Sequence, residues 1–449
     1  MVQDMTTGSP LRLILKFAFP LLLGNILQNI YQISDIMIVG RLINIQALAA
    51  VGASAPIYFV ILLITLGFTG GLTIVTAQQF GAKCECGVRR SVTHSIIAST
   101  ILSGICTFSM LLFLHPIMRL MNVPEEIMHD SYNFIFILTC GLILLVGYNL
   151  LSGFIRALGD SKTPLYFLFF STFLNIVLNL IFIYYGKMGI IGSAMGTIIA
   201  IGFSTIMCAW YISRKYPILR LHREDWRFDW AFMLHHLQVA VPMAIQFSII
   251  AFGLLIIQSI CNSFGADTIA AFTAALRLEQ LATQPMVALG LAIATYTAQN
   301  FGACKIGRIR HGVLSSSLIS LGFSVIIALT MRYGGENIIG LFINEDNDNI
   351  VTIARNYLNI STLFYFFLGQ IFIFRNALQG MGHSDIPLIA SIVELAMRSF
   401  AAFYLAKSMG YLGICYASPI AWIGAALVVS TGYFLTIRRI YRDGRIMRR

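Results

Sequence analysis

The chain carries an internal repeat that spans most of its length. The string AQQFGAK at residues 77–83 recurs as AQNFGAC at residues 298–304, an offset of 221 residues. A second pair, LGDS at 158–161 and MGHS at 381–384, is offset by 223 residues. Self-similarity at a nearly fixed offset indicates two related structural units, each built from about half of the chain.

Both halves are too apolar for a soluble protein. Of 449 residues, 58% are hydrophobic and 11% charged, whereas roughly a quarter of the residues of a soluble domain are charged. A helix of about 20 apolar residues crosses a bilayer core that is about 30 Å thick. Apolar runs of suitable length lie at 17–39, 52–78, 93–114, 131–151, 165–185, 189–211, 238–262, 271–298, 312–331, 352–374, 387–406 and 411–436.

These runs predict an all-α polytopic membrane protein with twelve transmembrane helices in two six-helix bundles. Because six is even, both repeats enter the membrane from the same side, and a pseudo-two-fold axis along the membrane normal should relate them. The expected division is an N-terminal bundle at 1–212, a cytoplasmic linker loop at 213–231 and a C-terminal bundle at 232–449. Duplicated membrane proteins of this kind are typically transporters.

The net charge of +11 is explained by membrane topology. With the N-terminus inside, most bases fall at the cytoplasmic ends of the spans, among them Arg89, Arg90, Arg220, Arg375 and Arg439. This positive-inside pattern predicts a multi-pass protein of the inner (plasma) membrane with both termini in the cytoplasm. We expect the lipid bilayer as a partner, no nucleic acid, and a monomer, because the fold needs no second chain.

The sequence shows neither a metal-site pattern nor an enzyme motif. The eight cysteines are scattered, and Cys84 and Cys86 are the only close pair, whereas a structural zinc site usually needs two such pairs. The chain has no His-Glu-x-x-His and no Gly-x-Ser-x-Gly string, the signatures of metalloproteases and of α/β-hydrolases. We therefore expect no metal, no cofactor and no enzymatic activity.

The first predicted span carries an acidic residue, Asp35. Gln28 and Tyr31 precede it at spacings that place all three side chains on one helical face. An ionisable side chain in a span costs ~2.5–3.5 kcal/mol on insertion scales and usually marks a transport pathway. A carboxylate there can carry a proton or hold a sodium ion. The alternative is an acid at the end of the helix that contacts the outer headgroups, because Gly40 follows after little more than a turn.

Amides and hydroxyls accompany Asp35 in the same half of the chain. Asn175 and Asn179 share one face of the fifth span, Asn149 closes the fourth, and Thr197 lies in the sixth. Each residue taken alone is an ordinary interhelical hydrogen-bonding group. Their occurrence in one repeat together with Asp35 favours a shared cation site.

The second half has its own ionisable residues within spans. Arg277, Glu279 and Gln280 open the eighth span, and a spacing of two prevents Arg277 and Glu279 from facing each other on a helix. They pair elsewhere or border an outer cavity, where they would contact substrate. Glu394 and Arg398 are four residues apart, the spacing of an internal ion pair.

Several of these strings together resemble the MATE (multidrug and toxic compound extrusion) family of the MOP superfamily. The most specific stretch runs from Pro20 to Gly52 and contains DIMIVGR at 35–41 and ALAAVG at 47–52. The paired FGA loops, ALGD at 157–160 and QGMG at 379–382, fit as well. The resemblance covers about residues 8–440.

The resemblance implies two six-helix bundles around a V-shaped cleft and efflux of small organic cations in exchange for protons or sodium. It assigns cation coupling to Asp35 with Asn175, Asn179 and Thr197 as neighbours, and substrate contact to Gln28, Tyr31 and Asn149. Asn179 is a departure, because many relatives carry a second aspartate there, so H⁺ and Na⁺ both stay open. Another branch uses acids in the seventh and tenth helices, where this chain offers Gln246, Gln258 and Gln370.

A flippase of lipid-linked saccharides, from the same superfamily, is the alternative function. It predicts a wide basic cleft that binds phosphates. The candidate bases within the spans, Arg277 and Arg398, each lie close to an acid in the sequence, which favours the antiporter.

Overall fold

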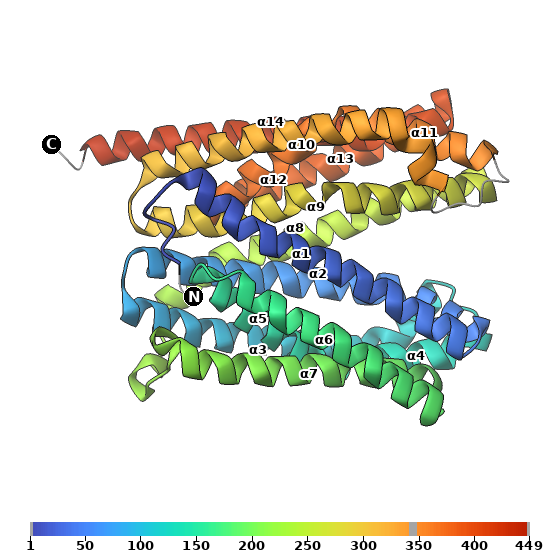
Figure 1. Cartoon of the computed structure of the whole chain (residues 1–449), viewed down its shortest axis with the longest axis horizontal. Coiled ribbons are helices and arrows are strands. Elements are labelled where there is room, and N and C mark those ends of the chain that lie inside the picture. Colours follow the sequence, from blue (N-terminus) through green and yellow to red (C-terminus); the bar gives the residue numbers. More distant parts are fainter. Residues whose placement is uncertain (1–2, 341–347, 447–449) are drawn as a thin grey trace. The chain divides into compact units, whose positions relative to one another are not determined.

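A computed structural model describes residues 3–340 and 348–446, and within these ranges the chain forms helices and no β-strand (Figure 1). The first repeat contains α1 (Pro10–Leu42), α2 (Ile45–Gly81), α3 (Glu85–Leu120), α4 (Glu125–Cys140), α5 (Leu142–Ala157), α6 (Lys162–Leu180) and α7 (Gly189–Lys215). The second contains α8 (Trp230–Cys261), α9 (Ala266–Gly302), α10 (Ile306–Gly340), α11 (Asp348–Leu363), α12 (Tyr365–Gly380), α13 (Asp385–Met409) and α14 (Tyr411–Ile446).

Ten of the described helices are long and apolar enough to cross a membrane. Two further pairs of consecutive helices are long and apolar enough when each pair is taken together. The helix axis bends by 45° between α4 and α5 and by 52° between α11 and α12. Counting each pair as one span gives the twelve that the sequence predicts. The sequence analysis placed one span in each of these two regions and did not address the bends, because apolar composition records hydrophobicity and carries no information about a change of helix direction. The break falls at the same place in both repeats.

The duplication is visible in the backbone of the repeated loops. Lys83 and Cys304, which end the two copies of the seven-residue string, adopt positive φ angles of 58° and 57°. Gly159 and Gly382, in the second pair of strings, adopt φ angles of 85° and 86°. A residue with a side chain rarely adopts a left-handed conformation. Its occurrence at both positions shows that the two copies share a loop structure as well as a sequence.

The described residues form two compact units. The first unit comprises the chain up to Asp4 together with Leu23–Ala244, and the second comprises Met5–Leu22 together with Ile245–Arg449. Helices α1 and α8 therefore each contribute to both units. Sequence repeats alone place a boundary between copies at 212–232 and do not report such an exchange of helical segments.

Each unit has its own apolar core. In the first, Phe68 and Leu72 of α2 pack with Phe154 of α5 and with Ala240, from the first half of α8. In the second, the first half of α1 supplies Phe17 and its neighbours to a core with residues of α9, α10, α12 and α14. The exchanged halves are thus buried parts of the units to which they belong.

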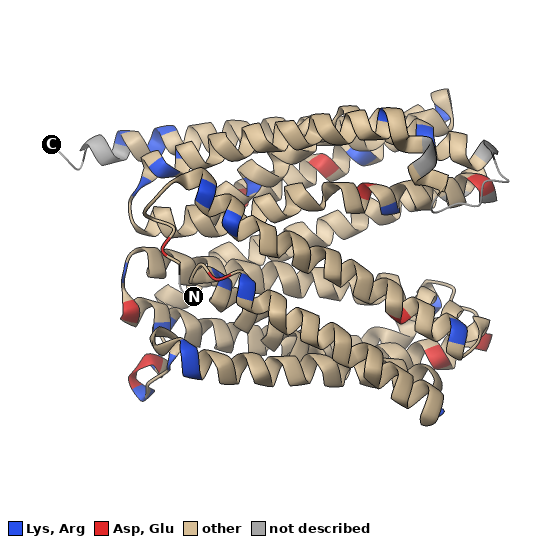
Figure 2. Cartoon of the chain, viewed as in Figure 1, with Lys and Arg blue, Asp and Glu red and all other residues tan. Residues whose placement is uncertain are grey.

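The predicted linker is attached to the first unit. Its ends are helical, since α7 extends to Lys215 and α8 begins at Trp230. Between them, Asp225 forms an ion pair with Arg89 of α3 at 3.3 Å, and Asp229 pairs with Arg90 at 2.9 Å. Figure 2 shows that charged residues gather near the ends of the helices and are sparse along their middles.

Asp225 makes a pH dependence of stability testable. This side chain is 5% exposed. Burial alone would raise its pKa, but a hydrogen bond from the backbone N–H of His222 and the guanidinium of Arg89 hold the pKa of Asp225 below its usual range. Such a group stabilises the fold above its unfolded pKa of about 3.9, and this contribution is lost as the pH falls through the lower folded pKa.

We therefore expect Asp225→Asn to lower the unfolding temperature at neutral pH, with a difference from wild type that shrinks below about pH 4. Thermal unfolding of the detergent-solubilised protein, measured from neutral pH down to about pH 3, tests this. Glu224→Gln is the matched control, because Glu224 is exposed. An equal decrease of the unfolding temperature in both variants would contradict the stabilising role assigned to the Asp225 carboxylate.

Candidate functional site

The first unit brings Asp35 together with polar groups of two other helices. Oδ1 of Asp35 on α1 accepts hydrogen bonds from Nδ2 of Asn179 on α6 at 2.6 Å and from Oγ of Ser193 on α7 at 3.2 Å. Asn179 and Ser193 are fully buried and Asp35 is half-buried. Asp35 is therefore held inside the helix bundle by neutral donors.

The hydrogen bonds continue away from the carboxylate as a chain. Asn179 also donates to Oδ1 of Asn175 at 3.2 Å, and Asn175 donates to Oγ1 of Thr197 at 3.1 Å. The hydroxyl of Tyr31 donates to the same Thr197 oxygen at 3.2 Å. This series of hydrogen bonds thus starts at Asp35 and ends at Tyr31, one turn apart on α1, and it connects α1 to α6 and α7.

Local structure positions the two asparagines. Oδ1 of Asp160 accepts hydrogen bonds from the backbone N–H groups of Lys162 and Thr163, at 3.0 and 3.1 Å, which fixes the start of α6. The other end of α6 passes into a π-helical turn, Ile181–Tyr185, directly after Asn179. Such wide turns occur frequently at functional sites.

Gly196 on α7 makes room for this arrangement. A Cβ atom at Gly196 would collide with Oδ1 of Asn179. This oxygen is buried and accepts no hydrogen bond from the described residues. A glycine is therefore needed where α7 passes the amide that binds Asp35.

The cluster offers oxygen atoms of several kinds. Asp35 supplies a carboxylate, Asn179 a carbonyl oxygen without a donor, and Ser193 a hydroxyl. Small hard cations prefer oxygen ligands of these types, and the carboxylate alone can take up a proton. Elsewhere, no group of three or more His, Cys, Asp or Glu side chains in the described ranges is arranged to hold a metal ion.

Two residues predicted for this site lie outside the hydrogen-bonded chain. Gln28 is exposed on α1. Nδ2 of Asn149, on α5, is buried without a hydrogen-bond partner among the described residues. Ser193 is the member that the sequence analysis missed. Its position four residues before Thr197, on the same face of α7, is the sequence signal that could have identified it.

The predicted residues of the second repeat lie in the second unit. Tyr357 donates a hydrogen bond to Oε2 of Glu279 at 3.1 Å, whereas Arg277 and Gln280 are exposed. These three residues therefore do not share one contact network.

The predicted pair between Glu394 and Arg398 is confirmed, with a distance of 2.6 Å. Arg375 joins it at 3.1 Å from the other carboxylate oxygen. All three side chains are buried. The sequence analysis placed Arg375 at a cytoplasmic helix end and did not predict its contact with Glu394, because a charge count does not report partners on another helix.

Comparisons with known proteins agree with the duplication. The profile of the MatE family matches the chain twice, at residues 20–181 and 242–403. The probable multidrug resistance protein YoeA of Bacillus subtilis (strain 168) is 27% identical over 93% of this chain and 92% of its own length. The probable multidrug resistance protein YpnP of the same organism is 29% identical over 87% of each. A crystal structure of MATE in the bent conformation has a similar fold, with a TM-score of 0.92, 22% identity and 98% coverage of both chains.

Substitution of Gly196 tests the packing around the asparagine amide. Gly196→Ala should lower the free energy of unfolding by about 1–3 kcal/mol, because the added methyl group displaces Asn179. Gly104→Ala on α3 is the matched control, since a Cβ there meets nothing within 4 Å. We expect the control to change stability by at most about 1 kcal/mol. Unfolding of both variants in detergent is the measurement, and equal stabilities would show that the site tolerates the methyl group.

Proposed function

The chain belongs to the MatE family of multi-pass membrane transporters, and we propose that it is a secondary-active antiporter exporting organic cations in exchange for H⁺ or Na⁺. The names of YoeA and YpnP as multidrug resistance proteins support this direction of transport and class of cargo. We propose further that the protein works as a monomer in the plasma membrane with both termini in the cytoplasm.

The observation that carries the proposal is the environment of Asp35. Its two hydrogen-bond partners, Asn179 and Ser193, are neutral donors, so the carboxylate can exchange its counter-charge. A proton, a sodium ion or a cationic substrate can each neutralise it, and only one can do so fully at a time. Competition for one carboxylate is a direct physical basis for exchange.

Coupling to a conformational change requires that two states bind the cation with different affinities. Asp35 lies in the part of α1 that belongs to the first unit, and Phe17 lies in the part that belongs to the second. Pro20 lies within the helix between them, and a proline weakens the hydrogen bonding of the preceding turn. We propose that neutralising Asp35 changes the hydrogen bonds to α6 and α7 and so bends or repacks α1.

The two coupling ions place different demands on the cluster. A proton needs Asp35 alone and removes one acceptor for the donors around it. A sodium ion needs several oxygens, for which Asp35 and the free Oδ1 of Asn179 are available. The asparagine at 179 supplies an oxygen without a second negative charge.

The contacts in the second unit weigh against the flippase alternative. Arg398 and Arg375 are both engaged by Glu394, so they are not available for the phosphates of a lipid-linked saccharide. Arg277 is exposed, and a single base does not form a basic cleft.

Transport in proteoliposomes tests the role of Asp35. A pH gradient and a sodium gradient are imposed in separate experiments. We expect one of them to drive ethidium transport by the wild-type protein, and the gradient that does so identifies the coupling ion. Asp35→Asn should abolish gradient-driven movement, because the amide cannot change its charge. Asp267→Asn, an exposed substitution in the first turn of α9, is the matched control. Driven efflux that survives in a folded Asp35→Asn protein would overturn the proposal.

A second prediction concerns Glu279, an acid of the second unit that accepts a hydrogen bond from Tyr357 at 3.1 Å. Glu279→Gln keeps the shape of the side chain and an oxygen that accepts from Tyr357. We expect this variant to retain gradient-driven transport in the same proteoliposome assay. Loss of driven transport in both Glu279→Gln and Asp35→Asn would instead place coupling in both units.

A further inference from the structure

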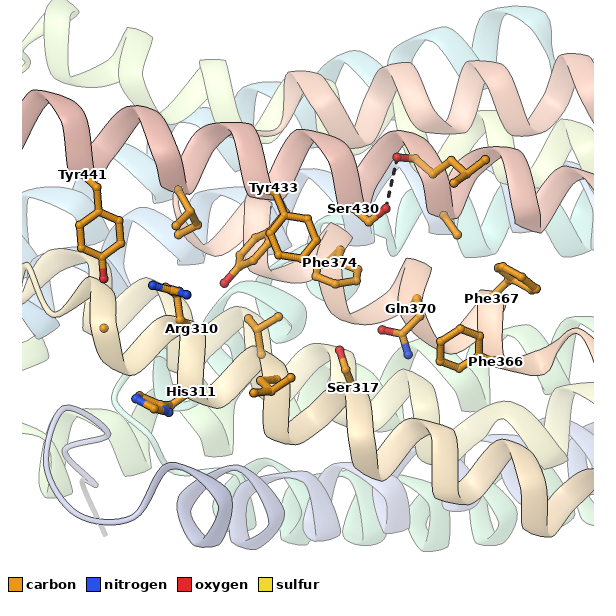
Figure 3. Close-up of a pocket in the computed structure, with 17 residues that line it drawn as sticks. Arg310, His311, Ser317, Phe366, Phe367, Gln370, Phe374, Ser430, Tyr433 and Tyr441 are labelled. Carbon is orange, nitrogen blue, oxygen red and sulfur yellow. Dashed lines mark hydrogen bonds between the residues drawn. The ribbon is translucent and has the colours of Figure 1, made fainter.

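A groove in the second unit is lined by α10, α12 and α14 (Figure 3). It encloses a volume of about 670 Å³ and is lined by residues from Gly307 to Tyr441. No residue of the hydrogen-bonded cluster around Asp35 lines it. We call it the α10–α14 groove.

The walls of the groove are mainly apolar, and the groove is open along one side. Phe374 and Phe367 of α12 lie between the two long helices. Leu314 on α10 and Leu427 on α14 form rims that are 61% and 60% exposed. In a membrane-spanning unit such exposed leucines contact acyl chains, so the groove is accessible from the lipid.

One end of the groove is basic. Arg310, near the start of α10, lies over the ring of Tyr441 with its guanidinium carbon 5.9 Å from the ring centroid, and His311 is next to it. The lining residues include no Asp and no Glu. An organic cation would therefore meet repulsion from Arg310 without a compensating acid.

The groove also contains polar groups that have no partner among the described residues. Nε2 of Gln370 and the hydroxyl of Tyr433 are buried and make no hydrogen bond, and neither does Oγ of Ser317. Gln370 is 7% and Tyr433 3% exposed. All three groups can donate hydrogen bonds, and buried donors are rarely left unsatisfied. An occupant with acceptor oxygens would satisfy these three donors.

We propose that the α10–α14 groove binds one anionic glycerophospholipid. The phosphate lies at Arg310, the ester carbonyls accept from the deeper donors, beginning with Tyr433, and an acyl chain follows Phe374 towards Phe367. Arg310 and Ser317 are separated by about 10 Å along α10, which matches the change from headgroup to upper acyl chain. Basic pockets between transmembrane helices are known to favour anionic headgroups.

Native mass spectrometry of the full-length protein in detergent tests the proposal. The probes are dioleoyl phosphatidylglycerol, which is anionic, and dioleoyl phosphatidylcholine, which is zwitterionic. We expect wild type to retain one phosphatidylglycerol under conditions that remove phosphatidylcholine. Arg310→Gln should reduce this retention about fivefold, the effect of one basic residue at a membrane surface.

The controls separate a specific site from general lipid contact. Arg439→Gln removes the same charge from an exposed position of α14 outside the groove and should leave retention unchanged. Tyr433→Phe removes one donor and should lower retention of phosphatidylglycerol. Leu314→Trp fills the groove and should abolish it, with the elution volume of the protein confirming that each variant is folded.

Four results would overturn the proposal. Equal retention of both lipids by wild type, or equal losses in Arg310→Gln and Arg439→Gln, would identify general lipid contact. Wild-type retention in Leu314→Trp would place the lipid elsewhere. Displacement of phosphatidylglycerol by ethidium, with ethidium retained in its place, would assign the groove to cationic cargo.

Discussion

The division of α1 and α8 between the two units constrains every other part of this protein. Each helix carries a proline, Pro20 or Pro242, and in each the unit boundary falls two residues later, after Leu22 or Ala244. A proline within a helix removes one backbone hydrogen bond and clashes with the carbonyl four residues earlier. The two repeats therefore place a weakened turn at the same position. On the mechanism proposed above, a bend confined to that turn would leave both apolar cores intact.

The two halves of α1 are held by different contacts, and Asp35 belongs to the half that lies in the first unit. The hydrogen bonds from Asn179 and Ser193 hold the second half of α1 on α6 and α7, while Phe17 holds the first half in the other core. A change of charge at Asp35 alters only the first set of contacts. On the proposed mechanism, the energy that moves α1 is the difference in cation affinity between two arrangements of the helix, as linkage requires.

The sequence predicted those features that depend on periodicity and left out those that depend on tertiary contact. The spacing of Tyr31 and Asp35, and of Asn175 and Asn179, places each pair on one helical face, and the structure joins them through Thr197. Ser193 was missed because serine is unremarkable in a transmembrane helix. The bends in two spans, the third member of the Glu394 cluster and the exchange of helical halves required coordinates, since no local pattern encodes them.

The two repeats share a fold but differ in how they accommodate a buried carboxylate. In the second unit, Glu394 lies between the guanidinium groups of Arg375 and Arg398, and removing its charge would leave two buried cations unpaired. Leaving a buried charge without its partner is strongly destabilising, so these three side chains are best explained as a structural cluster. In the first unit, the hydrogen-bond partners of Asp35 are neutral, so neutralising its charge leaves no arginine unpaired. The neighbours of the two carboxylates therefore differ: neutral donors contact Asp35, which fits the exchange proposed for it, and two arginines contact Glu394, which fits a structural cluster.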